Sequence, residues 1–297
     1  MSKIAVVCHD AGGAEIISSW LKNNSIKFSA HLEGPAKKIF EKKFNNNNNN
    51  NNNLDEMIKN SEWLLCGTSW QSDLENIAIN ISRMHKKKSV SFLDHWVNYK
   101  ERFAYKNNFI FPDEIWVGDS IAKDIAKNIF SHISIKQMKN EYLIDIQKQL
   151  QILGPAPKRP TKMALYVCEP ISEPAKIQYD DENYFNYNEE SALKFFLNNL
   201  ELLKINNILL RPHPSETSEK YLWAKSFSPI PLVISNSLDL LEDIHQADLV
   251  VGCESMAMVI GLMAKKRVIS SIPPHGRRCI LPHPEIERLD NIIEKTS

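Results

Sequence analysis

An arginine and a histidine, each followed by a proline, end an apolar segment in "LLRPHPSE", residues 209–216. Pro212 and Pro214 fix their own φ angles and favour extended backbone at Arg211 and His213, and neither proline can donate to a sheet ladder. The segment should therefore be stiff where a strand leaves its sheet. A guanidinium and an imidazole mounted in this way suit the binding of a phosphate group. The alternative is a surface turn that only ends the strand.

Glu254 and Ser255 stand between the strand-like "DLVVG" and a mostly apolar helical segment. The first N–H groups of a helix carry partial positive charge and have no partner inside the helix, so an anion can bind there. The Ser255 hydroxyl would add a hydrogen bond to a phosphate, and Glu254 would accept one from a ribose or sugar hydroxyl. Plain N-capping uses the same atoms, so both interpretations stand.

The stretch "CHDAGGAE" places His9 and Asp10 beside Gly12 and Gly13. The two glycines would let the backbone approach a ligand and let a helix start tightly. The spacing is not the GxGxxG of dinucleotide-binding folds. An aspartate at this position could act as a general base towards a hydroxyl. A helix cap followed by a turn is the alternative.

Hydrogen-bonding and aromatic side chains are dense in "FLDHWVNYKERF", residues 92–103. Such a mixture suits stacking and hydrogen bonding to a sugar or a base, whereas the alternative is a partly buried loop with aromatic anchors. A milder polar strand end, "GTSW", carries Thr68 and Ser69, whose alternative role is to cap the next helix. The side chains that make up the denser cluster are Asp94, His95, Trp96, Asn98, Tyr99 and Arg102.

Composition excludes several classes of protein. Lys plus Arg and Asp plus Glu both number 36 in 297 residues, so the broad basic field of a nucleic-acid-binding protein is missing. The five cysteines are scattered without a CxxC, which favours reduced, packed thiols over a zinc site. The serine-hydrolase GxSxG, the Walker pattern and a metal triad are absent, so no cofactor and no metal is predicted. The chain shows neither a signal-peptide layout nor an apolar run of membrane-span length, which predicts a cytoplasmic protein with peripheral membrane association left open.

Apolar strand-like segments alternate with helical segments along the whole chain. This alternation predicts an α/β fold with parallel sheets covered on both faces. The proline-rich stretch Leu153–Lys162 predicts a linker, and hence two Rossmann-like domains, 1–155 and 156–297, that face each other across a cleft. The asparagine run 45–53 is of low complexity and predicts a mobile loop without assigned function.

Ligands of open α/β sheets bind beyond the carboxyl ends of the strands. The polar residues described above crowd those predicted ends, and so does Glu169 after "MALYVC". Both His213 and Ser255 follow strands of the second half, and we expect them to approach each other across adjacent strand ends.

Two facing Rossmann-like domains resemble the GT-B architecture of glycosyltransferases. "RPHP" followed by "ADLVVGCES" is similar to the C-terminal halves of bacterial surface-polysaccharide transferases, and the His-Pro pair with a later serine resembles short motifs of bacterial sialyltransferases. The resemblance implies that His213, Pro214 and Ser255 serve the phosphate of a CMP-sugar. Those families carry an acidic-acidic-glycine motif that supplies the base. The nearest match here is Asp10-Ala11-Gly12, which lacks the second acid.

The sequence thus predicts a metal-independent glycosyltransferase of surface polysaccharide synthesis. Asp10 would activate the acceptor hydroxyl, and Arg211, His213 and the helix start at Ser255 would stabilise the departing phosphate. The N-terminal domain would hold a glycan or lipid-linked acceptor and the C-terminal domain the nucleotide-sugar donor. Three alternatives remain: a non-hydrolysing sugar-nucleotide epimerase, a polyol-phosphate transferase, and a non-catalytic module that binds a glycan or a nucleotide.

Overall fold

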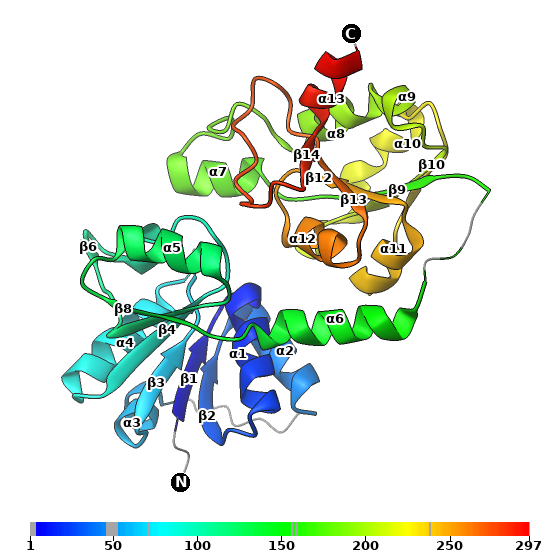
Figure 1. The fold of residues 1–297 in the computed structure, drawn as a ribbon. Coiled ribbons are helices and arrows are strands. Elements are labelled where there is room, and N and C mark those ends of the chain that lie inside the picture. Colours follow the sequence, from blue (N-terminus) through cyan, green and yellow to red (C-terminus); the bar gives the residue numbers. More distant parts are fainter. Residues whose placement is uncertain are drawn as a thin grey trace. The chain divides into compact units, whose positions relative to one another are not determined.

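The computed structural model describes residues 4–45, 53–69, 72–155, 157, 160–237 and 239–296. Most of the asparagine run and part of the proline-rich stretch lie outside the described residues, so the loop and the linker predicted there stay predictions. The chain divides into two compact units, Met1–Asp145 and Ile146–Ser297, with the division inside helix α6 (Glu141–Leu153). Each unit is built around its own parallel sheet (Figure 1).

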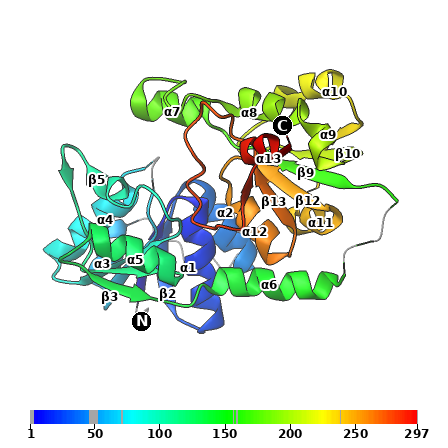
Figure 2. The same cartoon turned by 45° about the horizontal axis from the view of Figure 1, so that its top comes forward.

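The N-terminal unit contains a six-stranded sheet in the order β2-β1-β3-β4-β7-β8, in which all neighbours are parallel. Helices α1 and α2 lie on one face of this sheet and α3 and α4 on the other (Figures 1 and 2). The strands are β1 (Ile4–Cys8), β2 (Phe28–Leu32), β3 (Trp63–Cys66), β4 (Lys88–Leu93), β7 (Glu114–Val117) and β8 (Ser134–Gln137). The helices are α1 (Ala11–Asn23), α2 (Gly34–Lys43), α3 (Leu54–Lys59), α4 (Leu74–Met84) and α5 (Ser120–Ile129), and a small antiparallel hairpin joins β5 (Ala104–Tyr105) to β6 (Asn108–Phe109).

The C-terminal unit contains a second six-stranded parallel sheet, in the order β11-β10-β9-β12-β13-β14. Helices α8 to α10 lie on one face and α11 and α12 on the other (Figures 1 and 2). The strands are β9 (Met163–Val167), β10 (Asn207–Arg211), β11 (Leu232–Ile234), β12 (Leu249–Gly252), β13 (Arg267–Ser270) and β14 (Glu287–Arg288). The helices are α7 (Ser172–Tyr179), α8 (Glu189–Leu197), α9 (Leu200–Leu203), α10 (Trp223–Phe227), α11 (Leu240–Gln246), α12 (Met256–Met263) and α13 (Leu289–Thr296).

Strands β1 and β12 are apolar along their whole length. Every residue of β1 and of β12 is buried, because helices cover both faces of each sheet at these two strands. The α/β class and the two parallel sheets predicted from the alternating segments are therefore confirmed. No described helix has the length and apolar character that crossing a membrane requires.

Strand order reverses once in each sheet, and the two reversals fix where a ligand would bind. In the N-terminal unit the chain moves from β1 out to β2 and then returns to β3 on the other side of β1. In the C-terminal unit it moves from β9 through β10 to β11 and then returns to β12 on the other side of β9. Crevices at such switch points, outside the carboxyl ends of the strands, are the usual ligand sites of open α/β sheets.

The expectation that His213 and Ser255 follow adjacent strands is wrong. His213 follows β10 and Ser255 follows β12, and β9 lies between these two strands and pairs with both. The physical reason is the chain reversal at β9, which sends the later strand to the opposite side of the first one. Both residues still belong to the carboxyl edge of one parallel sheet.

The cysteines match the prediction of reduced thiols. Cys8, Cys66, Cys168 and Cys253 are free and buried, and Cys279 is free and partly buried. Within the described residues, no group of three or more His, Cys, Asp and Glu side chains is arranged to hold a metal ion.

Candidate functional site

Asp10 lies at the switch point of the N-terminal sheet, directly after β1. It occupies the N-cap position of α1, yet its side chain makes no capping hydrogen bond. Instead, Oδ1 accepts a hydrogen bond from Ser69 Oγ at 2.7 Å, and His9 Nδ1 lies 2.7 Å from the same oxygen. The alternative role of Asp10 as a side-chain cap is therefore not the one that the structure adopts. Its carboxylate is held between a hydroxyl and an imidazole from two neighbouring strand ends.

His9 is oriented from its main chain and from its ring. Its N–H donates to Glu75 Oε1 at 2.8 Å, and its Nε2 lies against Gly34, where an added Cβ would be only 2.7 Å away. Gly34 has a φ of +48°, a conformation that glycine adopts without strain. Because an ionised carboxylate only accepts, the contact with Asp10 places the proton of a neutral His9 ring on Nδ1.

Glu75 is a member of this site that the sequence reasoning missed. It is buried in the first turn of α4, and burial raises its pKa to about 8, with the nearby charges of Asp10 and Asp94 adding to the shift. Its Oε2 has no hydrogen-bond partner among the residues that the structure describes. The available signal was helical spacing, because Glu75 lies one turn before Ile79 and so falls on the buried face of its helix.

Asp94, which follows β4, and Arg102 come together with Thr68, which follows β3. Arg102 Nη1 donates to Asp94 Oδ1 at 2.8 Å and to Thr68 Oγ1 at 2.9 Å, and both charged side chains are largely buried. The other oxygen of Asp94 lies over Gly12, where an added Cβ would approach it to 1.8 Å. A Cβ at Gly13 would lie 3.0 Å from the Gly67 backbone. Both glycines thus allow the first turn of α1 to pack closely against neighbouring segments, and the approach of a ligand to this turn stays a prediction.

The aromatic residues of the loop after β4 act as anchors. Trp96 is buried, and its Nε1 donates to Asp119 Oδ2 at 3.0 Å, while Asp119 also caps α5. Tyr99 is fully buried, and the His95 ring packs against the Trp96 ring with centroids 5.4 Å apart. This is the anchored loop that the sequence analysis kept as an alternative. Contacts of Asp94, His95 and Arg102 with a sugar or a base stay a prediction.

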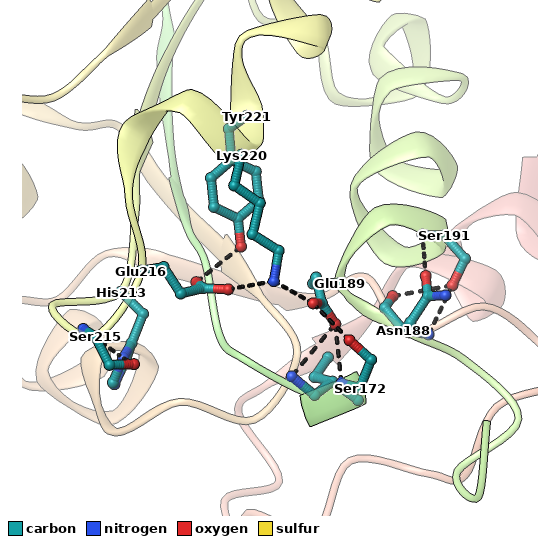
Figure 3. Close-up of polar contacts among 10 residues, drawn as sticks. Ser172, Asn188, Glu189, Ser191, His213, Ser215, Glu216, Lys220 and Tyr221 are labelled. Atoms are coloured by element: carbon teal, nitrogen blue, oxygen red, sulfur yellow. Dashed lines mark hydrogen bonds and ion pairs between the residues drawn. The ribbon is translucent and has the colours of Figure 1, made fainter. Parts of the chain in front are cut away.

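His213 follows β10, and its turn fixes which ring nitrogen carries the proton. The backbone N–H of Ser215 donates to His213 Nδ1 at 3.2 Å, and Ser215 Oγ lies 2.7 Å from the same nitrogen (Figure 3). A backbone N–H can only donate, so Nδ1 is the acceptor and the neutral ring carries its proton on Nε2. Burial lowers the pKa of His213, which favours this neutral form. No described residue forms a hydrogen bond with Nε2, so the Nε2–H group is available to a ligand.

Arg211 is tied into the sheet that it ends. Its Nη1 donates to Asp243 Oδ2 at 2.6 Å and to the Ser237 carbonyl at 3.1 Å. Asp243 also accepts a hydrogen bond from Ser235, so the arginine holds the end of β10 against the β11–α11 segment. Nη1 of the guanidinium is thus used in contacts within the protein, and a contact of Arg211 with a phosphate stays a prediction.

Ser255 and Glu254 begin α12 at the switch point of the C-terminal sheet. Ser255 Oγ caps the helix by accepting from the Ala257 N–H at 3.2 Å, as its capping interpretation requires. Glu254 is buried; its Oε1 pairs with Arg277 and its Oε2 accepts from the Ile280 N–H at 3.4 Å. Both carboxylate oxygens are engaged, which leaves Glu254 better suited to hold Arg277 than to bind a sugar hydroxyl.

Glu169 and Arg277 extend this end of the C-terminal sheet. Glu169 Oε2 accepts from the Glu254 N–H at 3.0 Å, and burial together with the negative charge of Glu254 raises the Glu169 pKa to about 8. The Arg277 guanidinium stacks on the Phe185 ring at 3.9 Å. From the sequence, Glu169 is recognisable only as a polar residue at a strand end, and Arg277 is not predicted as a site residue. The only available signal for the arginine was its place after the last long strand.

Comparisons with known proteins place the fold in a recognised group. No protein-family model matches the chain, and no curated protein matches it in sequence. Among solved structures it is similar to the UDP-GlcNAc 2-epimerase from Methanocaldococcus jannaschii, with a TM-score of 0.57, 12% identity, and coverage of 90% of this chain and 83% of the epimerase. At that identity the similarity shows the fold alone. The chain therefore has a two-unit, Rossmann-type α/β fold of the GT-B kind.

Two weaker similarities complete the comparison. The E. coli heptosyltransferase WaaC, solved with ADP-2-deoxy-2-fluoro heptose, gives a TM-score of 0.44 at 12% identity, with 99% of each chain covered. The wall teichoic acid polymerase TagF gives a TM-score of 0.42 at 11% identity, with 90% of this chain and 69% of TagF covered. Scores this low carry no argument about the function of this chain.

Proposed function

We propose that the chain is a glycosyltransferase that moves a sugar from a nucleotide-activated donor to a glycan or lipid-linked acceptor in surface polysaccharide synthesis. The observation that carries this proposal is the His213 imidazole at the carboxyl end of β10, held neutral with its Nε2–H group available. A neutral donor at a ligand-binding edge suits a phosphate oxygen. A CMP-linked sugar is the donor to test first.

Glycosyl transfer leaves negative charge on the departing nucleotide phosphate. Donors that are already in place when this charge develops lower the barrier, because they need no reorganisation at that moment. In this proposal His213 donates from Nε2, and Pro214 keeps its turn rigid. The first N–H groups of α12 and the Ser255 hydroxyl supply the partial positive charge of a helix start.

Asp10 is the proposed general base, acting on the acceptor hydroxyl. Ser69 and His9 fix its carboxylate through Oδ1, so that its orientation is set before an acceptor binds. The N-terminal unit is the proposed acceptor unit and the C-terminal unit the proposed nucleotide-sugar unit. The free thiols fit a reducing compartment, so we propose a cytoplasmic location, with peripheral membrane association through a lipid-linked acceptor.

Thermal denaturation with CMP, CDP, UDP and GDP tests the donor half of the proposal. A nucleotide that binds only the folded chain raises the melting temperature in proportion to the logarithm of its concentration above Kd. The matching nucleotide sugar is then incubated with and without glycan acceptors, and products are separated by mass spectrometry. Acceptor-dependent transfer supports the proposal, and failure of all four nucleotides to shift the melting temperature contradicts it.

A non-hydrolysing sugar-nucleotide epimerase is the second candidate. The GT-B-like fold favours it, and so do the carboxyls of the buried Glu75 and the partly buried Glu169, whose pKa values near 8 suit proton transfer close to neutral pH. An epimerase converts one nucleotide sugar without any acceptor. Product analysis in the absence of acceptor therefore separates the two candidates, and ligand binding without any turnover would favour a binding module.

A further inference from the structure

A lysine lies between two buried carboxylates behind the His213 turn. Lys220 pairs with Glu189 Oε1 and, at 2.7 Å, with Glu216 Oε1 (Figure 3). The side chains of Glu189 and Glu216 are only 7% and 5% exposed, while that of Lys220 is 38% exposed. These three residues are called the lysine bridge. Its side chains come from two segments that both follow β9 in the chain: Glu189 begins α8, and Glu216 and Lys220 lie after β10.

At one end of the bridge, Glu189 forms hydrogen bonds with the segment that follows β9. Glu189 accepts from the N–H groups of Ile171 and Ser172, at 3.3 and 3.0 Å, and from Ser172 Oγ at 2.8 Å. Its own helix does not need this carboxylate as a cap, because Asn188 and Ser191 already form a reciprocal capping box there (Figure 3). The Glu189 carboxylate is thus committed to the loop that carries Glu169.

The Glu216 end of the bridge fixes the turn that carries His213. The Glu216 N–H donates to the His213 carbonyl at 2.8 Å, and the Tyr221 hydroxyl donates to Glu216 Oε2 at 2.8 Å. Within the same turn Ser215 holds the His213 ring through Nδ1. The position of the imidazole is therefore set by the turn, and the turn is held by Glu216.

The charges explain why the bridge can specify geometry. One ammonium group compensates the charges of two buried carboxylates. Burial by itself would raise the pKa of Glu189, but the hydrogen bond from Lys220 is the largest of the interactions that lower this pKa to about 2. Removal of a single partner would leave a buried charge without compensation, which is far more costly than loss of a solvent-exposed pair. The chain contains such an exposed pair in Lys194 and Glu190, whose side chains are 42% and 56% exposed.

We propose that Lys220 is a positioning residue that, through Glu189 and Glu216, holds the His213 turn in register with the segment after β9. The fixed turn presents the Nε2–H group of His213 to a phosphate oxygen before the ligand arrives. The phosphate part of this inference rests on the proposed function, whereas the fixed turn and the ring tautomer do not.

Lys220→Met tests the bridge, and Lys194→Met is the matched control because it makes the same change in the exposed pair. Nitrogen-15 NMR of the histidine rings reports the His213 tautomer without any ligand. The wild type and Lys194→Met should show His213 with its proton on Nε2, and Lys220→Met should show exchange between the two tautomers. Retention of the single wild-type tautomer in folded Lys220→Met would overturn the proposal.

Nucleotide affinity over a pH range supplies the second readout. At pH 8, Lys220→Met should bind the nucleotide identified by the melting screen about tenfold more weakly than the wild type, because a displaced contact group loses much of its effect. The ratio of the two dissociation constants should fall towards unity as the pH is lowered to about 5, since Glu189 without its lysine takes up a proton above its wild-type range. Four other titratable groups face the bridge, namely Cys168, Glu169, His213 and Tyr221. Burial raises the pKa values of Cys168 and Tyr221, so both keep their protons between about pH 5 and 8, and the Glu189→Gln background separates the titration of Glu189 from those of Glu169 and His213.

Two further variants keep the test decisive. Glu189→Gln in the Lys220→Met background removes one of the two stranded carboxylates and should restore affinity at pH 8 to within about threefold of the wild type. If Lys220→Met fails to fold, Glu189→Gln alone releases the turn from the segment after β9 and should show partial tautomer exchange. A ratio of dissociation constants that does not change with pH would contradict the bridge. Absence of nucleotide binding in the wild type would contradict the proposed function and leave the NMR result to decide the bridge.

Discussion

The switch points of the two sheets differ in the hydrogen-bond donors that they offer to a ligand. In each unit a glutamate with a pKa near 8 lies at the carboxyl ends of the strands, the buried Glu75 in one and the partly buried Glu169 in the other. Around Glu75 the structure gathers two more carboxylates, Asp10 and Asp94. In the C-terminal unit Glu254 and Glu216 lie near Glu169, and hydrogen-bond donors stand at the strand ends as well, namely the Nε2–H group of His213 and the start of α12.

Under the proposed function, this difference assigns proton removal to the N-terminal unit and phosphate binding to the C-terminal unit. A site rich in carboxylates can take a proton from a hydroxyl, and a site rich in donors can hold a phosphate. The four predictions below test whether the division is real, in order of decreasing expected effect.

Asp10→Asn should abolish most turnover and leave nucleotide affinity unchanged. The amide keeps an oxygen for the hydrogen bonds from Ser69 and His9 but cannot accept a proton, so the loss should fall on kcat by about a hundredfold or more. Transfer assays and calorimetry measure the two quantities. Unchanged turnover would remove Asp10 as the base and direct attention to Asp94 or Glu75.

His213→Ala should weaken nucleotide binding and slow transfer together, by roughly tenfold each, because a phosphate contact serves both the bound donor and the transition state. The contrast with Asp10→Asn is the sharpest test of the comparison between the two sites. The two-site division fails if His213→Ala changes kcat alone or if Asp10→Asn loses nucleotide affinity.

Glu75→Gln should stabilise the protein at pH 8 and have little effect at pH 4. A carboxyl with a raised folded pKa binds its proton more tightly in the folded than in the unfolded protein. The stability of the folded protein is therefore complete at pH values below the unfolded pKa of Glu75, and part of it is lost as the pH rises towards about 8 and the buried carboxyl ionises. Glutamine has the shape of the protonated acid and carries no charge to bury. A gain of about 2 kcal/mol in the free energy of unfolding at pH 8, measured by urea denaturation, is expected. A loss of stability at pH 8 would show that the buried carboxyl is held ionised.

Ser255→Gly should have the smallest effect on stability and separate capping from binding. Glycine replaces serine at an N-cap at a cost of only a few tenths of a kcal/mol, whereas alanine costs about 1 kcal/mol. If the hydroxyl contacts a phosphate, Ser255→Gly weakens nucleotide binding several-fold while the melting temperature stays nearly constant. Wild-type affinity in this variant would mean that Ser255 serves α12 alone.

Sequence patterns located the strand ends that carry most of the candidate residues. Apolar segments followed by polar residues predicted β1, β3, β9, β10 and β12, because a strand that is buried on both faces needs consecutive apolar residues. The placement of Asp10, His213 and Ser255 at strand ends follows from local sequence alone. Glu75 was open to prediction by the helical spacing of α4, although its contact with His9 was not.

What the sequence by itself determined is therefore the α/β class, the two parallel sheets and the position of the polar residues at the carboxyl ends of strands. Tertiary structure alone decided that β9 separates β10 from β12, that Arg211 pairs with Asp243, and that Lys220 joins Glu189 to Glu216. The physical reason is the separation along the chain of the residues that interact. Strand and helix formation depend on the period of neighbouring residues, whereas strand order and the partners of buried charges depend on contacts between residues far apart in the chain.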